Sequence, residues 1–250
     1  MISIMKISKL DLSKIRDKKI LVFGVHGDDW LGISGTLKVL ADNNEVVGVV
    51  SSDGRMSGHE FELKGDELVN KRMEETRKYA QKLGLDKCLF WMYPDWDLVN
   101  RKNHITKKIV KLMLKERPDI VISLDPWGKY EGYEMSDTRT LAWLVMEGIK
   151  LATSPRWVQL HRLGRRMLQP EPQMWLMNPA EANGGVEIKE EIDLISFIDS
   201  FEFKFDEYVS KDEFVKNLEE KYLINGKLLN VSKAEAWRIM NYQSEWNENK

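Results

Sequence analysis

The sequence has little cysteine, no long apolar run and almost no net charge, and each absence excludes a class of protein. Cys88 is the single cysteine, so an internal disulfide cannot form. A run of about 18 apolar residues, which a membrane-spanning helix needs, is missing, and so is a secretory signal pattern; we therefore expect a cytoplasmic protein. A formal charge of -2 provides no overall field for nucleic acid or an anionic membrane, and we expect neither as a partner.

The composition is that of an ordinary globular protein, with 42% hydrophobic and 31% charged residues. A chain of 250 residues buries one substantial core, and we expect a single domain over residues 1–250. Unbroken apolar runs alternate with amphipathic stretches, a pattern that predicts a parallel α/β sheet with right-handed crossovers. Strands are expected at residues 20–25, 45–51, 87–93, 119–124, 173–177 and 186–188. Helices are expected at residues 31–40, 66–83, 105–115, 140–151, 190–205 and 211–222.

Three polar loops follow strands of this predicted sheet, at residues 26–29, 51–56 and 125–139. Ligands of open α/β sheets bind at the carboxyl ends of the strands, so these loops are the expected site. The first loop holds an imidazole and two adjacent carboxylates, which suits a metal that polarises a water molecule. The same loop would also serve as a phosphate-binding or solvated turn in which Asp28 caps the following helix. Spacing alone leaves both interpretations open.

The turn His26-Gly27-Asp28-Asp29, followed by Ser34-Gly35-Thr36, resembles the His-Pro-Asp-Asp and Gly-Gly-Thr motifs of the LmbE/PIG-L family of zinc-dependent N-deacetylases. Three further segments resemble that family in the same order, and the last is similar to its archaeal chitobiose-deacetylase branch. They are Arg72-Met73-Glu74-Glu75, then Asp125-Pro126-Trp127 with Tyr130-Glu131, and Ala234-Glu235-Ala236-Trp237-Arg238. The resemblance covers nearly the whole chain and implies a Rossmann-like, three-layer α/β/α fold with a mostly parallel sheet.

The resemblance also implies a function. His26 and Asp29 would ligate zinc or another divalent metal, and Asp28 would be the general base for water attacking the N-acetyl group of an amino sugar such as N-acetylglucosamine, or of a related amide. The partner would be that small molecule, and the resembling archaeal branch forms homo-oligomers, so we expect one here. Candidate substrate contacts are Arg55, Arg72 and Trp127.

The second metal motif departs from the family pattern. Where the family has His-Pro-Asp-His before an arginine, this chain has Met135-Ser136-Asp137-Thr138-Arg139, so both histidines are absent. A catalytic zinc normally has three protein ligands, and Glu134 or Asp137 would have to replace the missing one. Asp137 is thus an orienting residue or a third ligand. The alternative function is a catalytically inactive relative that serves as a ligand-binding or assembly subunit.

Other positions bear on this choice less strongly. The family's proline and glutamate in the first motif are replaced by Gly27 and Trp30. The remaining histidines, His59, His104 and His161, are expected in loops or on the surface, although His59 lies on the correct edge to reach inward. A nucleotide-binding Rossmann protein is a weaker interpretation, because the first turn lacks Gly-x-Gly-x-x-Gly and places carboxylates where a phosphate would bind.

Overall fold

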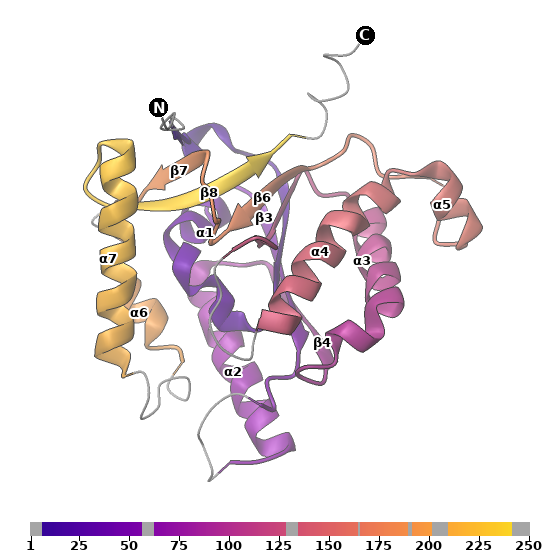
Figure 1. Cartoon of the computed structure of the whole chain (residues 1–250), viewed down its shortest axis with the longest axis horizontal. Coiled ribbons are helices and arrows are strands. Elements are labelled where there is room, and N and C mark those ends of the chain that lie inside the picture. Colours follow the sequence, from indigo (N-terminus) through magenta and orange to yellow (C-terminus); the bar gives the residue numbers. More distant parts are fainter. Residues whose placement is uncertain are drawn as a thin grey trace.

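A computed structural model describes residues 7–56, 63–128, 135–164, 166–189, 192–201 and 210–241. Its centre is an eight-stranded sheet in the order β1-β7-β8-β6-β5-β2-β3-β4, with helices packed on both of its faces (Figure 1). The strands are β1 Ser8–Lys9, β2 Lys19–Gly24, β3 Glu45–Ser52, β4 Lys87–Tyr93, β5 Ile120–Leu124, β6 Gln173–Met177, β7 Gly184–Glu187 and β8 Ala234–Met240. The predicted α/β/α architecture with a mostly parallel sheet is confirmed.

The helices alternate with the strands along the chain. The α-helices are α1 Ser34–Ala41, α2 Asp66–Leu83, α3 Lys102–Glu116, α4 Met135–Ala152, α5 Pro155–Leu160, α6 Leu194–Ile198 and α7 Lys211–Leu229. Three 3-10 helices are described as well, η1 Leu12–Lys14, η2 Gly27–Ile33 and η3 Leu98–Arg101. No helix in the described ranges combines the length and the apolar character that crossing a bilayer requires.

The central strand β2 shows why the apolar runs predict this sheet. Ile20, Leu21, Val22 and Phe23 are all completely buried, because β2 pairs in parallel with β3 on one side and β5 on the other and helices cover both faces. Burial of apolar side chains is the dominant favourable contribution to folding. The carboxyl end of β2, where the polar turn begins, therefore follows directly on a fully buried segment of the core.

Several predicted boundaries are wrong. Residues 31–33 are 3-10 helix, and the α-helix begins only at Ser34. The α-helix α4 begins at Met135 instead of 140, which places Asp137 on its first turn. The helix predicted for residues 190–205 is α6 in the described part, where the Asp193 side chain caps it by accepting from the Ser196 N–H.

Two strands were absent from the prediction, β1 and β8. β8 pairs antiparallel with both β6 and β7, so it is the exception in an otherwise parallel sheet. A buried glutamate, Glu235, interrupts its apolar pattern, which is why the segment does not look like a strand.

Candidate active site

The candidate site begins with the turn that follows β2. One carboxylate oxygen of Asp29 accepts hydrogen bonds from the backbone N–H groups of Val25 (2.6 Å) and His26 (3.1 Å). Asp29 therefore closes the turn, and the 3-10 helix η2 begins inside it. This closure holds His26 and Asp28 at the carboxyl edge of the sheet, where the sequence places the site.

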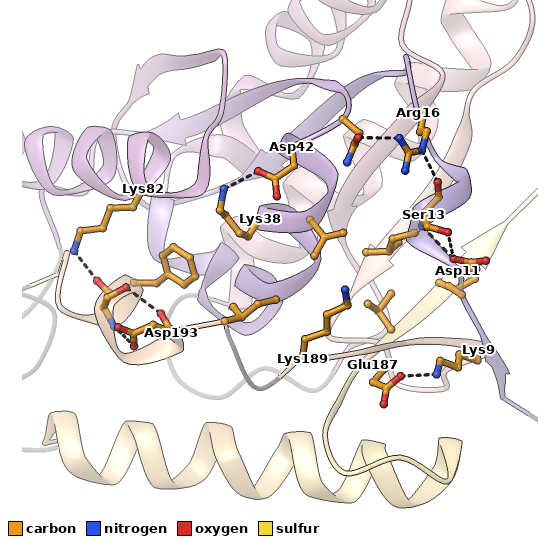
Figure 2. A pocket seen from close by; sticks show the side chains of 18 residues that line it. Lys9, Asp11, Ser13, Arg16, Lys38, Asp42, Lys82, Glu187, Lys189 and Asp193 are labelled. Atoms are coloured by element: carbon orange, nitrogen blue, oxygen red, sulfur yellow. Dashed lines mark hydrogen bonds and ion pairs between the residues drawn. The ribbon is translucent and has the colours of Figure 1, made fainter.

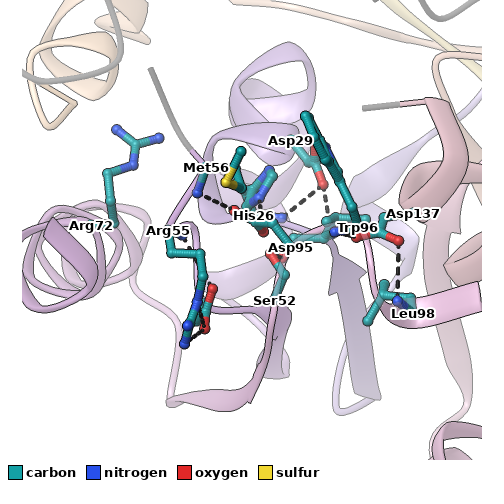
Figure 3. A network of polar contacts seen from close by, with 12 residues as sticks. His26, Asp29, Ser52, Arg55, Met56, Arg72, Asp95, Trp96, Leu98 and Asp137 are labelled. Atoms are coloured by element: carbon teal, nitrogen blue, oxygen red, sulfur yellow. Dashed lines mark hydrogen bonds and ion pairs between the residues drawn. The ribbon is translucent and has the colours of Figure 1, made fainter. Parts of the chain in front are cut away.

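His26 forms an ion pair with a residue that sequence analysis missed. Its Nε2 lies 2.9 Å from Oδ1 of Asp95, and the Met56 N–H donates to the other Asp95 oxygen at 2.8 Å (Figure 3). Burial opposes the charge of His26, but the bond to Asp95 and the charges of Asp28, Asp95 and Asp29 outweigh it and raise the pKa of His26 to about 9. Burial likewise opposes the charge of Asp95, but His26 lowers the pKa of Asp95 to about 2. Asp95 lies two residues after the end of β4. Because ligands bind at the carboxyl ends of strands in this class of fold, the sequence pattern could have predicted Asp95 as a site residue.

Arg72 reaches Asp28 from the helix α2. Its Nη2 lies 3.6 Å from Oδ2 of Asp28, and its Nη1 donates to Glu75 at 2.9 Å. The side chains of all three residues are largely buried, so their charges are screened less than those of a surface pair. Arg72 was predicted to lie near the rim as a substrate contact; the structure places it beside the predicted general base.

Asp137 holds the neighbouring loop. Its two oxygens accept from the backbone N–H groups of Trp96 (2.6 Å) and Leu98 (3.2 Å), and the side chain is buried. Burial raises the pKa of Asp137, although these two N–H groups act in the opposite direction. Because residues 96–98 adjoin Asp95, this geometry suits an orienting role, one of the two predicted for Asp137.

The other two predicted contacts follow the neighbouring strands. Arg55, three residues after β3, donates from Nε to Asp53 at 2.7 Å. Trp127 follows β5 and is half-exposed, with the Arg238 guanidinium 5.2 Å from its ring centroid and the Trp143 ring 4.9 Å away. β5 lies next to β2 in the sheet, so Trp127 stands at the same edge as the turn.

The remaining ligand candidates fall into two groups. His59, Tyr130, Glu131 and Glu134 lie outside the described residues. His104, in the first turn of α3, is exposed, and its ring lies 5.9 Å from that of Tyr93 at the end of β4. His161 is partly buried, with its ring 4.3 Å from that of Trp157.

A metal site requires several ligating side chains that lie close together. In the ranges described, no group of three or more histidine, cysteine, aspartate or glutamate side chains is arranged to hold an ion. One oxygen of Asp29 is bonded to backbone N–H groups, and Nε2 of His26 faces Asp95. Because a catalytic zinc needs three protein ligands, the described residues alone do not complete a zinc centre.

A wide groove lies elsewhere in the described part of the molecule. About 1170 Å³ in volume, it runs between α1 and residues 186–197 and contains none of the predicted site residues (Figure 2). Two ion pairs form among its charged side chains in the described residues, Lys38 with Asp42 at 2.7 Å and Lys9 with Glu187 at 2.5 Å. A hollow beside the turn itself is much smaller, about 20 Å³, and is lined in part by His26, Arg72 and Thr76.

Packing against Thr76 explains why position 27 is a glycine. A Cβ added there would lie 2.4 Å from both Cγ2 and Oγ1 of Thr76, so Thr76 fills the space that the family's proline would take. We expect Gly27→Ala to lower the free energy of unfolding by about 1–3 kcal/mol, as overpacking does. Urea unfolding measures this, and the matched double variant Gly27→Ala/Thr76→Ala should recover part of the loss. Strict additivity of the two changes would contradict the proposed contact.

Glu235 connects β8 to the turn. Its two carboxylate oxygens accept from the backbone N–H groups of Gly35 and Thr36, both at 2.9 Å, at the start of α1 directly after η2. Burial raises the pKa of Glu235 to about 7, although the bonds from Thr36 and Gly35 and the charge of Lys221 act to lower it. A residue about 200 positions away thus fixes the helix that follows the site.

This carboxylate makes stability depend on pH. From the ordinary value of 4.5 up to about 7, folded Glu235 retains a proton that the unfolded chain loses, so its contribution to stability falls as pH rises through this window. The decrease is at most about 3 kcal/mol. We expect Glu235→Gln to remove this part of the pH dependence in thermal unfolding between pH 4 and 8. Identical pH profiles for the variant and the wild type would contradict the assignment.

Known proteins resemble this chain in sequence and in fold. Residues 21–147, about half of the chain, match the family model described as PIG-L, GlcNAc-PI de-N-acetylase. A diacetylchitobiose deacetylase from Thermococcus kodakarensis is 36% identical over 158 residues, which are 60% of this chain and 58% of that protein. The match therefore spans less than two thirds of that curated relative.

Solved structures extend the likeness to most of the chain. The N,N'-diacetylchitobiose deacetylase from Pyrococcus horikoshii, complexed with its inhibitor MPG, has a TM-score of 0.83 and 27% identity, covering 92% of this chain and 87% of its own. GalB, a 4-carboxy-2-hydroxymuconate hydratase from Pseudomonas putida KT2440, has a TM-score of 0.68 and 14% identity, covering 90% and 96%. At that identity the second likeness concerns the fold alone, and it indicates that this fold also occurs in an enzyme with a different activity.

Proposed function

The chain belongs to the PIG-L family, and on that premise we propose that it hydrolyses the N-acetyl group of an amino sugar or a related amide. The observation that carries this proposal is the turn with His26, Asp28 and Asp29 at the carboxyl end of β2, in a chain that matches a diacetylchitobiose deacetylase at a TM-score of 0.83. A small N-acetylated sugar is therefore the proposed partner. The homo-oligomer and the cytoplasmic location stay predictions.

Asp28 is the proposed general base. Its carboxylate accepts a proton from water while the water oxygen attacks the carbonyl carbon of the N-acetyl group. The C–N bond of the resulting tetrahedral species then breaks, and Asp28 returns the proton to the leaving nitrogen. One water is consumed, and the products are acetate and a free amine.

Two neighbours position the groups of this step. Arg72 forms an ion pair with Asp28, its Nη2 lying 3.6 Å from Oδ2 of that carboxylate. Asp95, whose Oδ1 lies 2.9 Å from Nε2 of His26, orients the imidazole at the same edge of the sheet. Asp137 contributes indirectly by fixing the loop that carries Asp95.

The family also implies a divalent metal. Such an ion, when bound, polarises a carbonyl group and lowers the pKa of a bound water. His26 and Asp29 stay the predicted ligands, but the described residues do not complete the set of three, so the steps above use only the chain's own groups.

The direct test is amine release from diacetylchitobiose and from N-acetylglucosamine by the purified chain. We expect a new primary amine to form with time in proportion to enzyme concentration. Absence of amine from both sugars, with the protein folded, would overturn the proposal for this substrate class.

A second candidate function is a ligand-binding or assembly subunit without catalysis. The incomplete donor set among the described residues favours it. It predicts sugar binding by calorimetry without amine release, and no stoichiometric metal even in excess zinc. The enzymatic proposal predicts about one metal per chain by elemental analysis, lost in His26→Ala, with the third ligand supplied from outside the described residues.

A further inference from the structure

The near-neutral total charge hides a strong local segregation. Residues 101–117 contain seven lysines and arginines and one acid, and residues 155–166 contain four arginines and no acid. These two segments together carry a formal charge of +10, so the other 221 residues carry -12. A field of this local strength acts on a partner at the surface whatever the total charge of the chain.

The two segments meet in the fold. Gly164 packs beside Leu114 of α3, since a Cβ built on Gly164 would lie 3.6 Å from the Leu114 side chain. Arg117, at the end of α3, donates to the carbonyl of Gln169 at 2.8 Å. Figure 1 shows α5 projecting from the body beside this end of α3. The meeting point precedes β5, at the amino edge of the sheet and thus opposite the turn that follows β2.

The cations on this surface have no acidic partner in the part of the chain that the structure describes. We call basic face the exposed side chains of Lys107, Lys111, Arg156, Arg162 and Arg166. None of them forms an ion pair with a carboxylate of the described residues. Some exposed cations elsewhere do, for example Lys78 with Glu74 (3.1 Å) and Lys233 with Glu219 (3.2 Å).

An apolar side chain stands among these cations. Leu160, at the end of α5, is 74% exposed, more than any other large hydrophobic side chain in the described ranges. Arg156 lies one helical turn before it and Arg162 two residues after it. A protruding leucine flanked by arginines matches the requirements of a bilayer interface, where the apolar group enters the acyl boundary and the cations contact lipid phosphates.

We propose that the basic face docks this protein on an anionic lipid bilayer, with Leu160 entering the headgroup region. The phosphates of a nucleic acid would bind the same cations. Such a partner would leave the exposed Leu160 side chain without a function, so we favour the bilayer. Each basic side chain near an anionic membrane strengthens partitioning by about fivefold, so five of them give reversible, salt-sensitive attachment. Because α5 and the end of α3 lie at the amino edge, a protein bound through them keeps the turn with His26 open to water. The inference does not depend on the proposed hydrolysis.

Sedimentation of the full chain with phosphatidylcholine vesicles, with and without phosphatidylglycerol, tests this proposal. We expect binding only to the anionic vesicles, decreasing as salt increases. Arg156→Gln/Arg162→Gln should weaken binding by about 25-fold, and the matched control Lys78→Gln/Lys233→Gln should not. Leu160→Ser should weaken binding without changing its salt dependence.

Three results would overturn the proposal. One is no binding to anionic vesicles at low salt, and another is equal loss in the control and the arginine variant. The third is tighter binding to single-stranded RNA than to vesicles, unaffected by Leu160→Ser, which would assign the basic face to nucleic acid instead. Circular dichroism of each variant checks that its fold is retained.

Discussion

Asp28→Asn is expected to lower the rate of N-acetyl hydrolysis by about 10²–10⁴-fold, the usual contribution of a general base. Asparagine keeps the shape of the side chain but cannot accept a proton from water. The loss should fall on kcat with little change in KM, because the proton moves only in the transition state. Steady-state amine release from diacetylchitobiose measures both constants.

The matched control is Asp42→Asn, which removes a carboxylate from the exposed pair with Lys38 at the end of α1. It should leave both constants unchanged, since a surface ion pair contributes little. A rate in Asp28→Asn within a few fold of the wild type would contradict the assignment of the base. In that case Asp28, with Arg72 beside it, would have a structural role only.

Trp30→Ala is expected to lower the free energy of unfolding by about 3–5 kcal/mol. Trp30 is completely buried, and a Cβ added at Gly48 of β3 would lie 2.6 Å from its ring, so the indole packs directly on the sheet backbone. Alanine would leave a cavity beneath the site turn. Urea unfolding followed by circular dichroism measures the change.

Trp143→Ala is the control for this prediction, because Trp143 is about half exposed on α4. Trp143→Ala should lower the free energy of unfolding by well under half of the decrease expected for Trp30→Ala, because less apolar area is removed from the core. Equal effects of the two variants would contradict the role given to Trp30 as the support of the turn.

The strands and the site turn follow from the sequence because both rest on local rules. The apolar run of β2 predicts a strand buried on both faces, and the carboxyl end of such a strand is where ligands bind in this class of fold. His26, Asp28 and Asp29 lie at that end as predicted. Their roles as ligands and base stay predictions that the experiments above test.

What the sequence did not reveal depends on contacts between distant segments. Asp95 meets His26 only because β4 ends beside β3 and the 95–98 loop turns inward onto Asp137. Glu235 looked like a polar interruption, yet it is the carboxylate that fixes the start of α1. The replacement of the family's proline by Gly27 is understandable only with Thr76 in place against it.

The central claim is that water attacks an N-acetyl carbonyl at the turn after β2, and hydrolysis of diacetylchitobiose in isotopically labelled water tests it most directly. The account predicts that wild-type protein releases acetate carrying one labelled oxygen, and that Asp28→Asn releases almost none. Acetate without the label would contradict hydrolysis by water. No acetate at all from a folded protein that still binds the sugar would mean that this chain has kept the fold of the family without its chemistry.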